Sequence, residues 1–443
     1  MKRVAVTGLG AISPVGNDVP SFWNSLMAGR HGIDYITKFD TADYKVKIAA
    51  EVKNFNPLDY MDKGESRRED AFSQYALAAA IEAMGDSGLD ALSERPNIDP
   101  HRLGVYVGSG TGGMNTFMEE ARKLLETGPR KISPFFITML IGNMAAGNIA
   151  IRFNAQGPSL PVVTACATST NAIGEAYRAI KFGYADAVIA GGSEAAVVPL
   201  AVAGFTNCMA LTMRNDKDSC SVPFDKRRDG FVMGEGAGIL VLEEYERAVK
   251  RGAKIYGEVC GYGNTCDAHH VTAPRPDASG GARAISLALE EAGLPANAAG
   301  LPGDGLTGER GIFGGESGLT PQQIYYNAHG TSTPLNDKTE TLAIKRAFGP
   351  EAAAKLHISS TKSMTGHMLG AAGGIEAIAS VLALHEGRIP PTLGYKEADP
   401  DCDLNYTPNQ SAAADVRLSL SVSLGFGGHN GCLAFRKAQD ERR

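Results

Sequence analysis

One order of strand-like and helix-like segments occurs twice in this chain, and this repeat restricts the fold more than any other sequence feature. In the first half, the run 160–164 leads through Cys166 into a helix of small residues, and the segments DAVIAGG and GEGAGILVLEE follow. In the second half, the run 357–360 leads through Lys362 and His367 into another such helix, followed by SVSLGFGG and GHNGCLAFRK. Alternating strands and helices predict an α/β fold, and two related halves would bring both helix N-termini to one central site.

We place the boundary between the halves near Glu258, where a strand runs into the polar stretch 265–276. The predicted halves are therefore 1–258 and 259–443. The segment 295–321 has eight glycines between positions 300 and 318 and little aliphatic patterning. We expect it to be a variable surface insertion and assign it no role.

Composition excludes several classes of protein. The net charge of −6 argues against a nucleic-acid partner. No window approaches the roughly 18 apolar residues that a membrane span needs, so we expect no membrane association. The seven cysteines are scattered and form neither a disulfide framework nor a metal array. Because the N-terminus also lacks an apolar leader, we expect the reducing cytoplasm.

Two weaker motifs suggest cofactor binding, but both have simpler explanations. The segment VYVGSGTGG has the glycine spacing of a dinucleotide site after a strand. No carboxylate ends a strand about 20 residues later, so we interpret it as a tight turn. The adjacent His269 and His270 would point to opposite faces of a strand, and we predict no metal site there.

Cys166 and two histidines form the set that looks catalytic. Cys166 follows a strand and begins a helix, where free N–H groups and the positive end of the helix dipole would lower the thiol pKa and stabilise an oxyanion. A packed core cysteine is the alternative on that stretch alone. His329 in NAHGTST and His367 in STKSMTGH both follow strands, in loops of small polar residues from which a side chain can reach a pocket.

Four motifs together resemble those of the β-ketoacyl-[acyl carrier protein] synthases. They are TACATS around Cys166, NAHGTSTPLND around His329, STKSMTGH around Lys362 and His367, and GFGGHN around Phe426. The similarity is closest to the elongating enzyme of type II fatty-acid synthesis and extends from VTGLGAISPVGN to the final strand. It implies a thiolase-like fold, with two related halves in an αβαβα sandwich, and usually a homodimer.

The resemblance implies a decarboxylative condensation in three steps. An acyl group passes from carrier-protein phosphopantetheine to Cys166, malonyl-carrier protein loses CO₂, and the carbanion attacks the Cys166 thioester. His329 and His367 would donate hydrogen bonds to the malonyl thioester oxygen as charge develops on it. The backbone N–H groups of Cys166 and Phe426 would form the other oxyanion hole.

Further roles follow from the same resemblance. Lys362 would support the histidines electrostatically, with Glu376 as its charge partner. Thr331 and Thr333 would hydrogen-bond pantetheine, and Phe426 with Gly427 would form a gate to the acyl pocket. Thr111 would lie at the far end of that pocket, and Phe136 would reach it from the partner subunit. The segment 267–279 would be a second mobile loop. No organic cofactor is expected, and whether a monovalent cation binds is left open.

The implied partner is an acyl carrier protein, which is acidic. Although the chain is itself negative, a local basic patch could dock it: Lys63, Arg67, Arg68, Arg130 and Lys131. Two departures from the family pattern stand near the site. His429 lies beside the gate, at a position where many relatives have threonine. Met209 occupies a position where some relatives have a basic residue that faces the carrier protein.

Three related functions are alternatives. A thiolase would normally use a second catalytic cysteine, but Cys432 lies in the apolar strand CLAF. A non-catalytic chain-length partner of polyketide systems would usually lack the nucleophile, and Cys166 is present. A ketosynthase of a type II polyketide or specialised lipid pathway shares the chemistry, so the sequence leaves that pathway and the preferred acyl length open.

Overall fold

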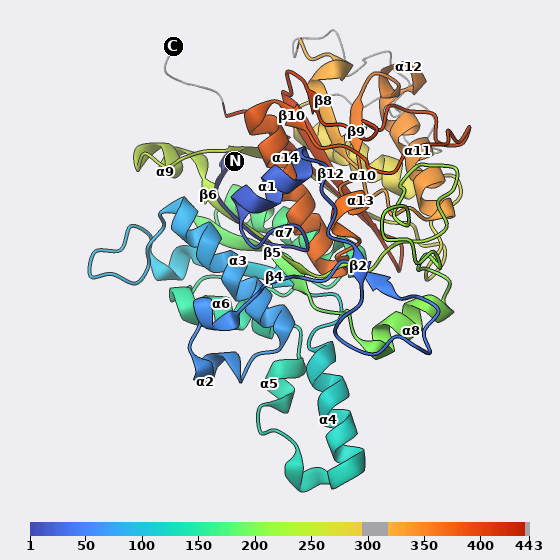
Figure 1. Ribbon diagram of the computed structural model, residues 1–443. Coiled ribbons are helices and arrows are strands. Elements are labelled where there is room, and N and C mark those ends of the chain that lie inside the picture. The colour runs from blue at the N-terminus through green and yellow to red at the C-terminus, as the bar shows by residue number, and fades with distance from the viewer. Residues whose placement is uncertain (295–317, 439–443) are drawn as a thin grey trace.

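The computed structural model describes residues 1–294 and 318–438 (Figure 1). Nine strands form one mixed sheet in the order β4-β5-β6-β1-β7-β13-β12-β8-β9. They are β1 (Val4–Ile12), β4 (Leu103–Gly108), β5 (Ala187–Glu194), β6 (Gly236–Glu244), β7 (Gly257–Cys266), β8 (Ile324–Asn327), β9 (His357–Ser359), β12 (Leu418–Gly425) and β13 (His429–Arg436). Short pairs are formed by β2 (Asp34–Tyr35) with β3 (Ile48–Ala49) and by β10 (Arg388–Ile389) with β11 (Ala412–Ala413).

Helices cover the sheet and also lie between its two halves. They are α1 (Val19–Met27), α2 (Lys63–Ser66), α3 (Ala71–Ser87), α4 (Met114–Thr127), α5 (Phe136–Leu140), α6 (Met144–Phe153), α7 (Thr168–Lys181), α8 (Pro199–Asn207), α9 (Tyr245–Lys250), α10 (Ser279–Glu291), α11 (Pro334–Phe348), α12 (Pro350–Ala353), α13 (Lys362–Thr365) and α14 (Ala372–Glu386). Three 3₁₀ turns matter for the site: η3 (Pro129–Lys131), η4 (Ala165–Ala167) and η6 (Leu369–Ala371).

The repeat predicted from the sequence is present in the sheet. In one half, β4 pairs parallel with β5, and β6 and β1 continue antiparallel. In the other half, β8 pairs parallel with β12, and β13 and β7 continue antiparallel. The halves join where residues 4–6 of β1 pair with residues 257–259 of β7. The predicted boundary at residue 258 falls inside this junction and stays a prediction.

Two buried helices, α7 and α14, lie between the halves of the sheet and contact strands of both. α14 is buried on all sides from Ala372 to Leu384, as expected of a helix that is apolar all round. A Cβ atom at Gly373 would lie 2.2 Å from the Thr170 hydroxyl, so the close crossing of α14 over α7 requires glycine there. With α3 and α6 outside one half and α10 and α11 outside the other, the layers are αβαβα, and the fold prediction is confirmed.

The run 160–164 is not a regular strand, contrary to our prediction. Ser159 forms one isolated bridge with Val105 of β4, and the Leu160 N–H donates to the Val105 carbonyl at 3.0 Å. The segment lies outside β4, as β9 lies outside β8 in the other half. Leu160 and Val163 are 51% and 59% exposed. The segment therefore makes one isolated bridge, whereas β9, which also has a single neighbour, forms a short regular strand.

No helix among the described residues is long and apolar enough to cross a membrane. Most of the predicted insertion at 295–321, namely residues 295–317, lies outside the described residues.

Candidate active site

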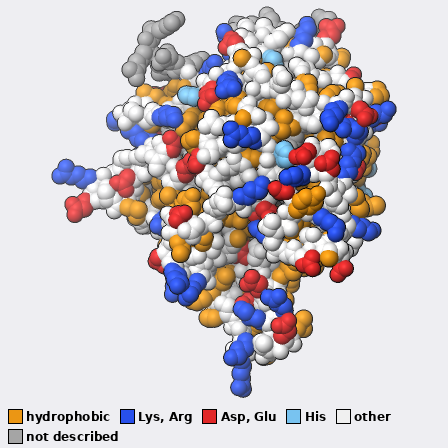
Figure 2. Space-filling model, in the orientation of Figure 1, with side chains coloured by type: hydrophobic (Ala, Val, Ile, Leu, Met, Phe, Trp, Pro, Cys, Tyr) orange, Lys and Arg blue, Asp and Glu red, His pale blue; other side chains and the backbone are white. Residues whose placement is uncertain are grey.

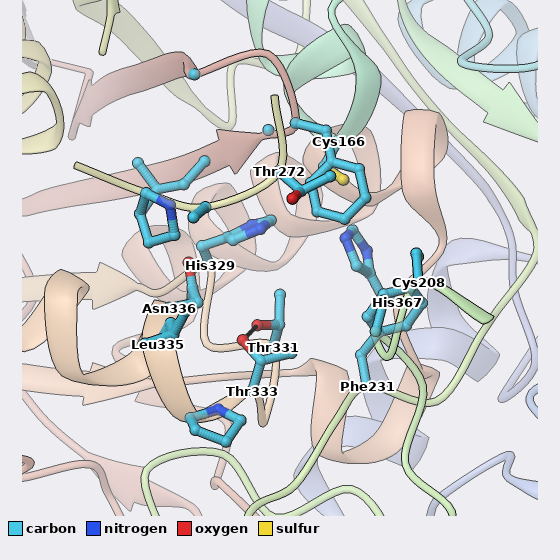
Figure 3. A pocket seen from close by; sticks show the side chains of 18 of the residues that line it. Cys166, Cys208, Phe231, Thr272, His329, Thr331, Thr333, Leu335, Asn336 and His367 are labelled. Atoms are coloured by element: carbon cyan, nitrogen blue, oxygen red, sulfur yellow. Dashed lines mark hydrogen bonds between the residues drawn. The ribbon is translucent and has the colours of Figure 1, made fainter. Parts of the chain in front are cut away.

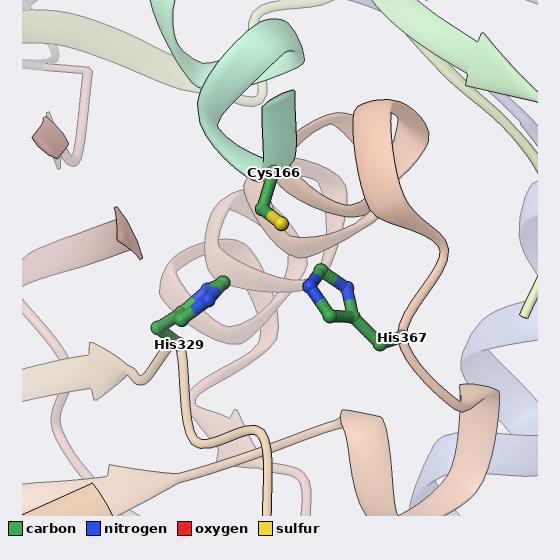
Figure 4. Close-up of side chains that lie close together, drawn as sticks. All are labelled: Cys166, His329 and His367. Atoms are coloured by element: carbon green, nitrogen blue, oxygen red, sulfur yellow. The ribbon is translucent and has the colours of Figure 1, made fainter. Parts of the chain in front are cut away.

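Cys166 lies in the turn η4, directly before α7 (Figure 4). The preceding residue, Ala165, has a φ of 50°, a left-handed conformation that costs a non-glycine residue free energy unless its surroundings hold it. Gly425, at the end of β12, packs directly on this turn. A Cβ atom there would come within 3.3 Å of the Cys166 amide nitrogen. The backbone therefore fixes the point from which the Cys166 side chain projects.

The pKa of the Cys166 thiol is raised, whereas the sequence analysis predicted that it would be lowered. Burial raises this pKa to about 11, because a thiolate is poorly solvated inside the protein. The Lys362 ammonium and the Phe426 backbone N–H lower it, and the charges of Glu194 and Glu376 raise it. Desolvation thus outweighs the effects of the Lys362 charge and the Phe426 N–H, and the resting nucleophile is a neutral thiol that must lose its proton during the reaction.

Both predicted histidines lie beside Cys166 (Figure 4). One candidate ligand atom from each of the three side chains lies within 4.8 Å of the others. The ring centroids of His329 and His367 are 5.2 Å apart, with the ring planes at 86°. Cys166 comes from the first half of the fold and both histidines from the second. The structure therefore brings together the three side chains that the sequence singled out.

A backbone hydrogen bond fixes the tautomer of His367. Its Nδ1 accepts the N–H of Leu369 at 3.2 Å, so the proton of the neutral ring lies on Nε2. Burial and the charge of Lys362 hold the pKa of His367 well below its usual range, which keeps the ring neutral. A metal-bound imidazole donates from its second nitrogen, whereas Nδ1 accepts here. His367 is therefore arranged as a hydrogen-bond donor and not as a metal ligand.

His329 is held through its backbone by a buried carboxylate. The N–H groups of His329 and Gly330 each donate to one oxygen of Glu340, on α11, at 2.7 Å. Burial lowers the pKa of His329 well below its usual range, and Lys362 and His367 lower it further. The sequence analysis did not identify Glu340. Its signal was a glutamate on the buried face of the helix that follows the NAHG motif.

Lys362 and Glu376 form a buried ion pair behind the histidines. They are 1% and 2% exposed, and Lys362 Nζ contacts Glu376 Oε1. Neither belongs to the described residues that line the pocket. The positive charge of Lys362 nevertheless lowers the pKa of Cys166 and of both histidines. Lys362 can therefore act on the site through its electric field.

The three central side chains open into a pocket of about 350 Å³ (Figure 3). Thr331 and Thr333 line it, with their Oγ1 atoms 2.9 Å apart. Phe231 adds an apolar wall, and its ring centroid lies 5.0 Å from that of His367. A pocket that combines apolar walls with convergent polar groups is typical of a site for a small molecule or a prosthetic arm.

The loop around Phe426 forms another wall of this pocket. Phe426 and Gly428 line it, whereas Gly427 does not. The Gly427 N–H donates to the Val271 carbonyl at 2.8 Å, and the Asp267 N–H donates to the Gly428 carbonyl at 2.9 Å. The two segments that the sequence analysis expected to move are therefore hydrogen-bonded to each other. Their mobility stays a prediction.

Thr111 and Phe136 do not line the pocket. The N–H and hydroxyl of Thr111 both donate to Glu194 Oε1, at 3.1 and 2.8 Å. Phe136 begins α5, in an arm that α4 and α5 form away from the body of the molecule (Figure 1). Their predicted contacts with an acyl chain stay predictions.

All five residues of the predicted docking patch are exposed. Lys63 lies in α2, Arg67 and Arg68 follow it, and Arg130 and Lys131 lie in η3, at the tip of the arm. Figure 2 shows basic side chains gathered at this tip. The pocket itself has an apolar rim, in which Met209 and Leu335 are 81% and 60% exposed.

Two family models match this chain. The model of the β-ketoacyl synthase N-terminal domain matches residues 1–248, and that of the C-terminal domain matches residues 315–396. The chain therefore belongs to the β-ketoacyl synthase family, which are condensing acyltransferases.

Individual relatives narrow the class further. The chain is 49% identical to 3-oxoacyl-[acyl-carrier-protein] synthase 2 of Synechocystis sp. over 440 residues, which covers 99% of both chains. It is 48% identical to the Staphylococcus aureus protein of the same name over 437 residues, 98% of both. Among solved structures, a β-ketoacyl synthase from Burkholderia phymatum superposes with a TM-score of 0.85 at 33% identity, covering 99% of this chain and 100% of that one. The ishigamide ketosynthase/chain length factor superposes with a TM-score of 0.85 at 36% identity, again covering 99% of this chain and 100% of that one.

Proposed function

We propose that this chain is a 3-oxoacyl-[acyl-carrier-protein] synthase of the second type, which condenses a Cys166-bound acyl group with malonyl-carrier protein in fatty-acid elongation. The observation that carries this proposal is the grouping of one thiol and two neutral imidazoles in a single pocket. Identity of 48–49% to synthases of that name, over nearly the whole chain, supports it.

In the first half-reaction, the Cys166 sulfur attacks the acyl thioester of the carrier and expels the pantetheine thiolate. The thiol proton leaves Cys166 and reaches the departing sulfur, so the exchange is neutral overall. Oxyanion stabilisation would come from the N–H groups of Cys166 and Phe426, since the Phe426 N–H already faces the thiol. Thr331 and Thr333 would hydrogen-bond the pantetheine arm.

In the second half-reaction, malonyl-carrier protein loses CO₂, and the electron pair becomes an enolate of the thioester. Neutral His367 donates its Nε2 proton in a hydrogen bond to the enolate oxygen, and His329 donates the second. Donors aimed at developing charge stabilise the transition state more than the ground state. The carbon then attacks the acyl group on Cys166, the sulfur leaves as thiolate, and it takes up one proton to restore the thiol.

The proposed partners are an acyl carrier protein, docked on the basic patch, and a second copy of this chain. A homodimer would cover the apolar edge at 159–164 and the exposed arm formed by α4 and α5. A solved relative with 32% identity and a TM-score of 0.83 is a type II polyketide ketosynthase in complex with its acyl-carrier protein. The proposed compartment is the cytoplasm.

A monovalent cation is a further proposal for this site. Glu376 Oε2 and Asn327 Oδ1 are both buried oxygens that have no hydrogen-bond partner among the described residues. The Asn327 amide donates to the Tyr325 hydroxyl, whose pKa is raised by burial and further by the charge of Glu376, so these groups lie in one neighbourhood. Two hard oxygens of this kind suit a cation such as K⁺ or Na⁺, which would lie behind the histidines.

The polyketide or specialised-lipid reading has less support, because the matching ketosynthase structures are 32–36% identical. Mass spectrometry of the Cys166 peptide, after incubation with a mixed pool of acyl-carrier proteins, separates the two pathways. Saturated acyl groups on Cys166 support the proposal, and poly-β-keto groups contradict it. The Cys166→Ala variant serves as the control, because it should take up no acyl group and form no 3-oxoacyl product.

A further inference from the structure

Glu194 is a buried carboxylate to which the sequence analysis assigned no role. It ends β5 and is fully buried. Its Oε1 accepts the Ser109 hydroxyl at 2.8 Å and both donors of Thr111. Its Oε2 accepts the backbone N–H groups of Gly110 and Gly370, both at 2.9 Å. One side chain of the first half therefore binds a loop of its own half and a turn of the second.

The contact is close enough to require glycine on both sides. A Cβ atom at Gly110 or at Gly370 would lie 2.7 Å from Glu194 Oε2. The carboxylate thus lies between two backbone segments that almost touch. Backbone N–H groups cannot accept hydrogen bonds, so Oε2 must present lone pairs to both of them.

The turn that Glu194 holds is the one that sets the tautomer of His367. Leu369 precedes Gly370 and has a φ of 47°, which an L-residue adopts only where its surroundings hold it. In that conformation the Leu369 N–H points at His367 Nδ1. The Gly370 carbonyl is held as well, because it accepts the Ser169 hydroxyl from α7. Without an anchor at Gly370, the turn can relax and the Leu369 N–H leaves the imidazole.

We propose that Glu194 is a positioning residue for the decarboxylation step. By fastening Gly370 it holds the strained turn at Leu369 and so keeps His367 as an Nε2–H donor toward the pocket. The inference rests on the proposed function for the role of His367, but the effect on the tautomer does not depend on it.

Two conservative variants distinguish the effect of the length of the Glu194 side chain from the effect of its negative charge. In Glu194→Asp the carboxylate is one methylene shorter and cannot hold Gly370, although the charge stays. In Glu194→Gln the length stays, and the amide nitrogen can face the hydroxyls of Ser109 and Thr111, which rotate to accept it, so that only the bond from the Thr111 backbone N–H is lost. The amide oxygen then still accepts the Gly370 N–H. Glu243→Asp is the matched control: it shortens another fully buried carboxylate, at the opposite end of the same strand pairing, where Glu243 binds Arg247 and Arg251.

The readouts are kcat and KM for decarboxylation of malonyl-carrier protein and the ¹⁵N NMR tautomer signature of His367 in histidine-labelled protein, assigned with His367→Gln. We expect Glu194→Asp to lower kcat at least tenfold with KM unchanged and to mix the two tautomers, since loss of one oxyanion donor costs about 10²–10³ in rate. Glu194→Gln and Glu243→Asp should stay within about threefold of wild type and keep the Nε2–H signal.

Three results overturn the proposal: a wild-type tautomer in Glu194→Asp, an equal loss of kcat in Glu194→Gln, or an equal loss in Glu243→Asp. If the wild-type protein does not decarboxylate malonyl-carrier protein at all, the proposed function fails. The NMR signature of the same variants then still decides whether Glu194 sets the tautomer.

Discussion

The buried pair of Lys362 and Glu376 gives a stability prediction whose size follows from its burial. Removing one partner leaves an uncompensated charge in the interior, which costs about 3–5 kcal/mol, whereas replacing both by apolar side chains is close to neutral. We therefore expect Lys362→Met and Glu376→Leu to be unstable singly and the double variant to recover. The coupling energy of the double-mutant cycle should be about 3 kcal/mol or more.

The same energy sets the expected shift in melting temperature. An unfolding entropy of about 2.1 cal/mol/K per residue gives a chain of this length about 0.9 kcal/mol/K, so each single variant should melt about 3–5 °C lower. Differential scanning calorimetry measures this shift, and denaturant titration gives the free energies of unfolding. A double variant as unstable as either single variant would refute the reasoning.

The sign of the pH dependence distinguishes the two single variants. Burial raises the pKa of Glu376, and in Lys362→Met the opposing charge of Lys362 is gone, so the folded state binds a proton that the unfolded state releases. Lys362→Met should therefore become more stable, relative to wild type, as the pH falls from 8 to 6. Glu376→Leu should not gain stability in this way, because the buried group that remains is the amine of Lys362, which burial stabilises in its deprotonated form. The double variant should be stable yet slow in decarboxylation, since the field of Lys362 is lost.

Three further predictions concern chain length, docking and titration. Thr111→Phe should lower kcat/KM for long acyl-carrier substrates far more than for short ones, because overpacking costs about 1–3 kcal/mol; coincident length profiles would place Thr111 away from the acyl chain. Arg67→Glu with Arg68→Glu should raise the KM for carrier-bound substrates and weaken its salt dependence, and an unchanged KM would argue for another docking face. Because burial depresses the pKa of His329, the unfolded state takes up a proton below pH 6.5 that the folded state does not. Lowering the pH from 6.5 to 5.5 should thus cost wild type about 1 kcal/mol more than His329→Asn in denaturant titration, and equal losses would contradict the depressed pKa.

Local sequence patterns predicted the repeat of strands and helices. They also predicted the three central side chains, because each of these side chains lies at the end of a strand or turn. Cys166, His329 and His367 follow a strand or turn directly, and the fold class determines that such ends meet. The roles of Glu194 and Glu340 could not be predicted in the same way. Each depends on hydrogen bonds to backbone N–H groups of a distant or folded-back loop, and no pattern of residue types encodes which N–H groups point inward.

Two sequence inferences failed for physical reasons. The thiol pKa depends on how much water the folded pocket excludes, and burial reverses the shift that a helix start predicts for Cys166. The run 160–164 has strand-forming residues, but in the single chain the segment makes only the isolated bridge between Ser159 and Val105 of β4. Thr111 is bound by Glu194 in the single chain, and its contact with an acyl chain stays a prediction.

The open edge at 159–164 has a consequence for biosynthesis. A newly made chain exposes Leu160 and Val163 beside the outer edge of β4, and an exposed strand edge is a template on which other extended peptides can pair. In the proposed homodimer, correct assembly requires an encounter between two chains, and it competes with aggregation and with binding to chaperones. Yield of this enzyme is therefore expected to depend on how quickly nascent copies find each other, and co-localised translation would favour recovery over misassembly.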